Sequence, residues 1–176
     1  MRYLTEVATF VGPLSFVFDD DALGVDAAGN VCRGAVTKAC FGPKRKLKAG
    51  DATYVAPLTA TGDLGQIVAA IGRWSAGDAN ALDPVPVLQA GSEFRQKVWQ
   101  VLRQVPGGDV ITYQQLAVKA GKPAAVRAVG TTMALNAVAP FVPCHRVVRT
   151  GGEIGNYAYG SEMKVAILER EGLIVE

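Results

Sequence analysis

Histidine and cysteine are scarce in this chain. Its 176 residues include one histidine, His145, and three cysteines. A four-ligand zinc site needs closely spaced cysteine or histidine pairs, which this sequence does not provide. We therefore expect no metal. An odd number of cysteines in a chain too large to need disulfide staples also favours free thiols and a reducing, intracellular compartment.

Long hydrophobic runs are also lacking. The first twenty residues hold no basic start followed by an unbroken apolar stretch, because Glu6 interrupts early and Pro13 follows. We therefore expect neither a secretory signal nor a membrane span. Because 49% of the residues are hydrophobic, the chain can fill a packed core. The expected product is a soluble protein of the cytoplasm, or of the nucleus in a eukaryote.

No strong excess of one charge is present, since the formal net charge is +2. Residues 1–89 carry eight basic and nine acidic side chains, whereas residues 90–176 carry ten and seven, so the basic excess lies in the second half. Such an excess fits either a phosphate-facing surface or a solvated face. The same two interpretations, a solvated loop or a DNA-backbone contact, apply to the basic run in residues 42–50.

The first half has the pattern of a small α+β unit. Strands are predicted over residues 13–18, 22–36 and 53–60, and a helix over 63–74. The second strand region contains a turn at Gly29–Asn30, Pro57 weakens the third, and Asp63 can cap the helix. Residues 75–91 show no period, so we interpret them as the linker between domains 1–86 and 87–176.

The second half is dense with helix signals. Ser92 opens an apolar stripe that ends at residue 105, and Thr112 with Gln115 forms a capping box. Pro123 stands where a first helical residue is favoured, so the next helix is predicted over 124–135. Two short helices joined by Gly-Lys-Pro predict a helix-turn-helix. The second of these helices is rich in small residues, and Arg127 is its one long cationic side chain. This composition fits either tight packing between helices or close approach to DNA.

Cys144 and His145 stand side by side in "VPCHRVV". A thiol becomes a nucleophile as thiolate, and a histidine backed by a carboxylate lowers the barrier to its deprotonation. Neighbouring side chains of an extended segment point to opposite faces, so a water would have to relay the proton. Either Glu169 or Glu171 could supply the carboxylate. The alternative is that Cys144 is a small buried hydrophobe.

Five motifs together resemble the O6-alkylguanine-DNA alkyltransferases, a family of direct-reversal DNA repair proteins. They are "VITYQQLA", "VRAVGTTMALN", "VPCHRVV", "GNYAYG" and "KVAILEREG", in the family's order and spacing over about residues 92–173. The first half is similar to the family's ribonuclease-H-like N-terminal domain only through "GPLSFVFDDDALGVDA". The resemblance implies an α+β protein with a ribonuclease-H-like N-terminal α/β domain and a mostly helical C-terminal domain that carries the helix-turn-helix.

The resemblance also implies roles for individual residues. Cys144 would accept the alkyl group, His145 and Glu171 would form the proton relay through a water, and Arg146 would be buried and structural. Asn136 would be the hinge before the active-site segment, and Tyr113 would donate a hydrogen bond to the guanine ring. The DNA contacts would be Thr112, Gln114, Arg127 and Ala128, with Arg127 filling the gap left by the extruded nucleotide. The pocket would comprise Val147, Gly155, Asn156, Tyr157, Ala158 and Tyr159.

Three positions depart from the family's pattern. Ala137 follows the hinge asparagine where many members carry proline, so the backbone is less restricted there. Ala158 replaces a frequent serine, which leaves only its backbone N–H to reach the guanine oxygen. Tyr159 replaces a frequent glycine, and its ring at the pocket mouth would exclude bulky adducts or stack on them.

The main hypothesis is a single-turnover repair protein that acts on double-stranded DNA containing O6-alkylguanine, and by extension O4-alkylthymine, as a monomer without a cofactor. A second hypothesis is an alkyltransferase-like binding module that extrudes and marks alkylated guanine without transfer, although such relatives usually lack the cysteine. A third is a cysteine hydrolase, which the adjacency of Cys144 and His145 disfavours.

Overall fold

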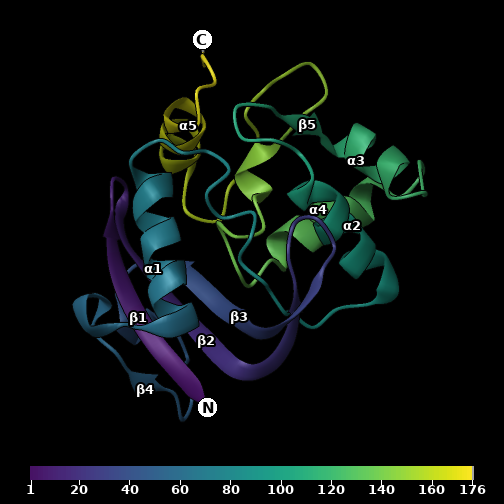
Figure 1. Ribbon diagram of the computed structural model, residues 1–176. Coiled ribbons are helices and arrows are strands. Elements are labelled where there is room, and N and C mark those ends of the chain that lie inside the picture. Colours follow the sequence, from purple (N-terminus) through teal and green to yellow (C-terminus); the bar gives the residue numbers. More distant parts are fainter. Residues whose placement is uncertain (176) are drawn as a thin grey trace.

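The computed structural model describes residues 1–175 and places a four-stranded sheet beside a mainly helical second half (Figure 1). The strands are β1 (Arg2–Thr9), β2 (Gly12–Val25), β3 (Val31–Phe41) and β4 (Thr53–Tyr54), in the sheet order β3-β2-β1-β4. The pairs β1–β2 and β2–β3 are antiparallel, whereas β4 runs parallel to β1.

The sheet is larger than the sequence pattern predicts. β1 was not expected, and the strand expected over residues 13–18 is part of a fourteen-residue β2. The turn after β2 lies where the glycine predicts it, because Gly29 has a φ of +92° and the Asp26 carboxylate accepts from Asn30. The strand predicted over residues 53–60 is mostly wrong. Only Thr53–Tyr54 pair, and Pro57 begins the 3-10 turn η2 (Pro57–Thr59).

Helix α1 (Gly62–Ser75) lies across one face of the sheet (Figure 1). Its buried side chains are Leu64, Ile67, Ala70, Ile71 and Trp74, which recur on one helical face as the sequence predicts. The predicted cap is wrong: Thr61 is the N-cap residue, and Asp63 lies in the first turn. The short 3-10 turn η1 (Lys44–Lys46) carries part of the basic run at the surface.

The second half contains four α-helices, one 3-10 turn and two short strands. They are α2 (Glu93–Arg103), β5 (Ile111–Thr112), α3 (Tyr113–Lys119), α4 (Val126–Ala134), the 3-10 turn η3 (Cys144–Arg146), β6 (Val147–Val148) and α5 (Ser161–Arg170). Ser92 caps α2 by accepting from the Arg95 N–H at 3.3 Å, and Thr112 with Gln115 forms the predicted capping box on α3. Helix α4 begins at Val126, so Pro123 does not occupy its first position.

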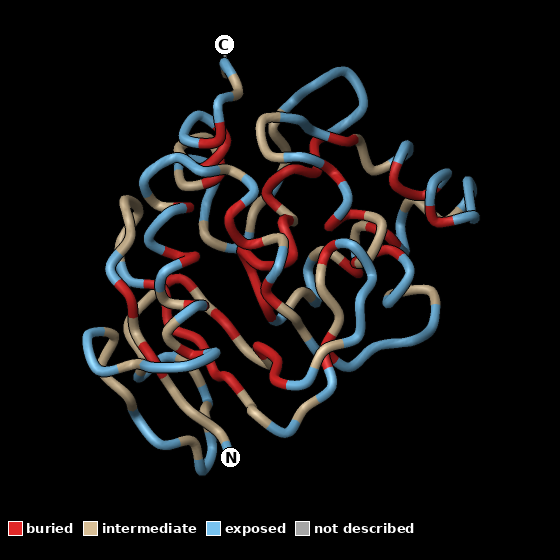
Figure 2. Tube along the Cα trace, in the orientation of Figure 1, coloured by how far each residue is buried: buried red, intermediate tan, exposed pale blue. Residues whose placement is uncertain are grey.

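One apolar core joins the two halves of the chain. The cluster of buried apolar residues includes members of β2, β3, α1, α2, α4 and α5, and Figure 2 shows buried stretches through the middle of the molecule. Phe16 of β2 meets Phe141, in the segment before Cys144, edge to face at 6.0 Å between ring centroids. Among residues 1–175, none of the helices combines the length and apolar character needed to cross a bilayer.

Arg103 ties the linker to both halves. Its buried guanidinium donates to four carbonyl oxygens, those of Val25 at 2.7 Å, Val85 at 2.8 Å, and Leu82 and Asp83 at 3.3 Å. Burial lowers the pKa of Arg103 to about 10, which leaves the side chain cationic at neutral pH. The irregular segment between α1 and α2 is therefore fixed by a side chain of α2.

We predict that Arg103→Met destabilises the protein by about 2–4 kcal/mol, because it removes the hydrogen bonds to these four carbonyl groups and leaves that of Val85 without a donor among the described residues. Urea unfolding followed by circular dichroism measures this loss. The exposed Lys97→Met in the same helix is the matched control and should change the free energy of unfolding by less than about 0.5 kcal/mol. Equal effects of the two substitutions would contradict the anchoring role.

Candidate active site

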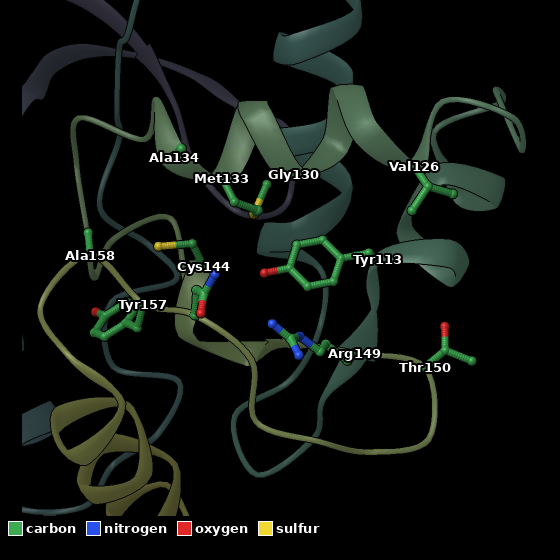
Figure 3. A pocket seen from close by; sticks show the side chains of 11 residues that line it. Tyr113, Val126, Gly130, Met133, Ala134, Cys144, Arg149, Thr150, Tyr157 and Ala158 are labelled. Carbon is green, nitrogen blue, oxygen red and sulfur yellow. The ribbon is translucent and has the colours of Figure 1, made fainter.

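A pocket of about 660 Å³ opens between α4, the start of α3 and the loop after β6 (Figure 3). Its lining residues come from four segments: Tyr113 from α3; Val126, Gly130, Met133 and Ala134 from α4; Cys144 from η3; and Arg149, Thr150, Asn156, Tyr157 and Ala158 from the loop. The α4 contributors recur three or four positions apart, so one face of that helix forms a pocket wall. No carboxylate side chain is among these lining residues.

Cys144 begins the 3-10 turn η3 and is half-buried in the pocket. Burial raises the pKa of its thiol, whereas the Asn136 amide and the Lys164 ammonium act in the opposite direction. The pKa stays above the ordinary cysteine value, so the resting group is the neutral thiol. A nucleophilic role for Cys144 therefore requires a base to remove its proton during the reaction.

A buried carboxylate lies behind the cysteine turn. Glu171, at the C-terminal end of α5, accepts hydrogen bonds from Nε2 of His145 and, at 2.8 Å, from Nε of Arg146. Burial alone would raise the pKa of Glu171, but His145 and Arg146 outweigh it and lower the pKa below its usual range. Arg146 also donates to the Val105 carbonyl at 2.7 Å and the Ala79 carbonyl at 2.9 Å. Glu169, the other carboxylate considered from sequence, is exposed.

His145 has one ring nitrogen left free by this network. Nε2 faces the Glu171 carboxylate, so it carries the proton, and Nδ1 is then an acceptor. Nδ1 is buried and has no hydrogen-bond partner among the described residues. Burial lowers the pKa of His145 below its ordinary value despite Glu171, which keeps the imidazole neutral at neutral pH. A neutral imidazole with an unused lone pair, next along the chain to a half-buried thiol, is suited to accept a proton through one bridging water.

Asn136 connects the end of α4 to the active-site segment. Its Nδ2 donates to the Val142 carbonyl at 2.9 Å, and its Oδ1 accepts from the Val138 N–H at 3.2 Å. Gln89 of the linker completes the arrangement by donating to Asn136 Oδ1 at 3.2 Å and accepting from the Ala137 N–H at 2.9 Å. Sequence reasoning missed Gln89, because a glutamine in an irregular segment carries no local signal.

Tyr113 is the first residue of α3 and projects into the pocket (Figure 3). Burial raises the pKa of its phenol, the Cys144 thiolate form acts in the same direction, and Arg149 opposes both. The hydroxyl is therefore a neutral donor at neutral pH. The Arg149 side chain lies on the same side of the pocket as Tyr113 in Figure 3, and it forms a loose ion pair with Glu153 at 3.7 Å.

Lys164 is a second residue that sequence reasoning missed, after Gln89. Its ammonium is buried and donates to the Val147 carbonyl at 2.6 Å and the Asn156 carbonyl at 3.2 Å, so it ties the pocket loop to the strand after Cys144. Burial lowers its pKa to about 8. A lysine on the otherwise apolar face of α5 was the only available sequence signal, because Ile167 and Leu168 follow it toward the core.

The structure brings together Tyr113, Cys144, Asn156, Tyr157 and Ala158 around the pocket. Three other residues expected in the pocket, Val147, Gly155 and Tyr159, do not line it. Of the four residues expected to contact DNA, Thr112 ends β5 and caps α3, Gln114 of α3 donates to the Pro123 carbonyl at 3.1 Å, and Arg127 and Ala128 are exposed in the first turn of α4.

Residues 93–173 match the family described as "6-O-methylguanine DNA methyltransferase, DNA binding domain". The chain is 47% identical over 87 residues to the bifunctional transcriptional activator/DNA repair enzyme Ada of Escherichia coli, covering 49% of this chain and 25% of Ada. It is 49% identical over 87 residues to the human methylated-DNA--protein-cysteine methyltransferase, covering 49% of this chain and 42% of that protein. The chain thus spans less than half the length of these two relatives.

The fold is similar to a solved structure over nearly the whole chain. The structure of Mycobacterium tuberculosis OGT in complex with DNA superposes with a TM-score of 0.73 and 25% identity, covering 96% of this chain and 92% of that one. The similarity therefore includes the sheet of the first half, which lies outside the family match to residues 93–173.

Because His145 is the only histidine in the sequence, its contribution to the pH dependence of stability can be measured separately from that of the carboxyl groups. His145 has a lowered pKa in the folded protein, so below about pH 6.5 the unfolded chain binds a proton that the folded one does not. We predict that the free energy of unfolding falls as the pH drops from 7 to 5.5, by up to about 1.4 kcal/mol per pH unit.

Urea unfolding of the wild type and of His145→Asn at several pH values in this window measures the effect. The variant should lose most of the slope, whereas contributions from carboxyl groups are common to both proteins and cancel. Equal slopes would show that the folded protein protonates His145 as readily as the unfolded chain.

Proposed function

We propose that the chain is a member of the 6-O-methylguanine DNA methyltransferase family, which its residues 93–173 match, and that it repairs alkylated DNA by taking the alkyl group onto Cys144. The observation that carries the proposal is a half-buried thiol in a pocket of about 660 Å³, with the free Nδ1 of a Glu171-bound imidazole next to it in the chain. A pocket of this size admits a purine. The substrate would be O6-alkylguanine in double-stranded DNA, and by extension O4-alkylthymine.

The proposed reaction is one displacement. His145 Nδ1 takes the thiol proton through a water, and Glu171 stabilises the resulting imidazolium. The sulfur then attacks the alkyl carbon, an S–C bond forms as the C–O6 bond breaks, and the electron pair stays on the purine. The purine is protonated as it leaves, so guanine is restored. Because a thioether has no good leaving group, each molecule acts once.

Two groups that line the pocket would help the purine leave. The Tyr113 hydroxyl would donate to a ring nitrogen as negative charge develops there, and the Ala158 backbone N–H would donate to O6. Lys164 is close enough to lower the pKa of Cys144, so its charge favours the thiolate. Asn136 would hold the hinge between the DNA-binding helix and the cysteine turn.

DNA binding would use α3 and α4 as a helix-turn-helix. The alkyl group on O6 is shielded inside a duplex, so the nucleotide must be extruded at a cost of a few kcal/mol. Helix α4 carries both the exposed Arg127 and a wall of the pocket, which allows the arginine to enter the base stack while the nucleotide occupies the pocket. The small residues of α4 suit the narrow minor groove.

The chain would be organised as two domains. Residues 1–86 would form a ribonuclease-H-like domain and residues 87–176 the DNA-binding and alkyl-acceptor domain. The protein would act as a monomer, without a cofactor, in the compartment that holds the DNA.

We predict stoichiometric transfer from a duplex that contains O6-methylguanine. The peptide with Cys144 should gain the mass of one methyl group in place of one hydrogen, with at most one group per protein, and Cys144→Ala should gain none. Mass spectrometry of the digested protein measures both results.

Binding of the modified duplex by the wild type without any mass change would instead support the alkyltransferase-like binding module. Repeated turnover of an ester or peptide substrate would support a cysteine hydrolase.

We predict that Arg127→Ala slows repair of duplex DNA by about tenfold or more, because no side chain then fills the gap in the base stack that the extruded nucleotide leaves. Reaction with free O6-benzylguanine should stay within about twofold of wild type, since no extrusion is needed. Single-turnover rates on both substrates measure the difference.

Arg73→Ala, an exposed arginine of α1, is the matched control and should leave both rates unchanged. An equal loss on duplex and free base would assign Arg127 to the displacement step instead.

A further inference from the structure

The residue after the hinge asparagine has both of its backbone groups bonded to other parts of the chain. The Ala137 N–H donates to Oε1 of Gln89 in the linker at 2.9 Å, and the Ala137 carbonyl accepts from the Ala39 N–H of β3 at 2.8 Å. Each bond holds one of the two peptide planes that meet at the Cα of Ala137. The linker and the sheet therefore fix the direction of the backbone at this residue from outside.

An alanine at this position needs such support more than a proline would. A proline ring holds φ at about −65° and has no N–H, whereas an alanine leaves φ free and presents a donor that has to be bonded. Ala137 is exposed and its side chain is a single methyl group, so packing does little to hold it. The hydrogen bond from Gln89 supplies the restraint that the side chain itself does not.

The same glutamine also orients the side chain of the hinge. Its Nε2 donates to Oδ1 of Asn136 at 3.2 Å, and the Val138 N–H donates to the same oxygen, also at 3.2 Å. With two donors at Oδ1, the Asn136 amide has one favourable orientation, which directs its Nδ2 to the Val142 carbonyl 2.9 Å away. Val142 stands two residues before Cys144, so one carboxamide connects the linker, the hinge and the chain that leads into the cysteine turn.

Gln89 is a rigid support because its own position is fixed. The residue is buried, and its carbonyl accepts from Nε2 of Gln96 in α2 at 2.6 Å. The preceding residue, Leu88, donates its N–H to the Val36 carbonyl of β3 at 3.0 Å. Contacts with both the sheet and α2 therefore hold the backbone that carries the Gln89 side chain.

The hinge separates two parts of the candidate site. Before it, Met133 and Ala134 of α4 belong to one wall of the pocket, and after it, Cys144 carries the thiol. A displacement reaction requires the sulfur, the alkyl carbon and the leaving oxygen to be aligned, and a misplacement of about 1 Å slows such a reaction strongly. Movement at the hinge would shift the sulfur relative to the wall against which the purine is held.

We propose that Gln89 is a positioning residue, which holds Asn136 and Ala137 so that Cys144 keeps its place relative to α4. Its effect on alkyl transfer rests on the proposed function, whereas its hydrogen bonds to the hinge can be tested without it. The linker, which the sequence marks only as an irregular segment, thereby takes part in aligning the reaction.

Single-turnover kinetics separate positioning from DNA binding. Gln89→Leu removes both side-chain hydrogen bonds and should lower the transfer rate at saturating O6-methylguanine duplex by about fivefold to thirtyfold. The rate with free O6-benzylguanine should fall by a similar factor, because the sulfur is misplaced for both substrates. Duplex affinity, measured in a Cys144→Ala background where no transfer occurs, should change by less than about twofold.

Gln100→Leu is the matched control. Gln100 of α2 also joins the two halves, since its Nε2 donates to the Asp26 and Ala27 carbonyls at 3.2 Å, and none of its hydrogen bonds among residues 1–175 reaches the hinge. Its loss should weaken the fold but change the transfer rate by less than about twofold.

A double-mutant cycle with Ala137→Pro tests the restraint on the backbone. In that background residue 137 has no N–H for Gln89 to accept, and the ring already fixes φ. Gln89→Leu should then lower the transfer rate by at most about threefold. The same loss in both backgrounds would overturn the proposal that Gln89 acts by holding the backbone of Ala137.

Hydrogen exchange measures the hinge without any alkyl transfer. In Gln89→Leu, the amides of Ala137 and Val138 should exchange about fivefold faster or more, as followed by NMR, because one loses its acceptor and the other depends on the Asn136 amide. The Val36 N–H, which donates to a linker carbonyl at 2.9 Å, is the internal reference and should change by less than about twofold. A wild type that transfers nothing would refute the proposed function and leave these exchange rates to decide the role of Gln89.

Unchanged transfer rates in folded Gln89→Leu would overturn the inference, as would unchanged exchange at Ala137. A loss confined to duplex affinity would assign Gln89 to DNA binding instead. Equal slowing in Gln100→Leu would mean that general loosening between the two halves, and not the Gln89 contacts, lowers the rate.

Discussion

The candidate site depends on one buried carboxylate. Glu171 accepts from both His145 and Arg146, and a charge at that depth is tolerated only because both partners are present. The carboxylate fixes which imidazole nitrogen carries the proton and so leaves Nδ1 without a partner among residues 1–175. Arg146 extends the arrangement to carbonyl groups of the linker and of the segment after α2. Positions far apart in the chain are thus held around one charge.

The Cys144 thiol and the His145 imidazole are both kept neutral by burial. Burial raises the pKa of Cys144 and lowers that of His145, so neither group is charged at rest. The two cations near the pocket, Lys164 and Arg149, face no carboxylate among the lining residues. The site therefore favours negative charge when it forms, on the sulfur or on a departing purine, without maintaining it beforehand.

The two halves of the chain are less independent than a division into domains suggests. Ala39 and Phe41 of β3 contact the segment between Asn136 and Cys144 and the pocket loop, Arg103 fixes the linker, and Phe16 packs on Phe141. The family match covers residues 93–173, yet side chains of the first half contact the segments that carry the candidate site. Substitutions in the sheet can therefore alter the site without touching it.

Local signals in the sequence were sufficient for the parts of the fold that are built from neighbouring residues. The Ser92 cap, the Thr112–Gln115 capping box and the turn at Gly29 each depend on bonds that span a few positions, so pattern alone predicted them. The motif around Cys144 likewise indicated the family, because its residues are contiguous in the chain. Strand β1 and the start of α4 were missed because pairing and packing overrode weak local preferences.

Only the tertiary structure decided which distant groups meet. His145 and Glu171 lie 26 residues apart, and the choice of Glu171 over Glu169 follows from which of them the end of α5 turns inward. Gln89, Lys164 and the packing of Tyr159 against Phe41 leave no trace in local sequence, because each is defined by a partner far along the chain. The sequence determined the chemistry that is available, and the packing of the two halves determined which residues can act together.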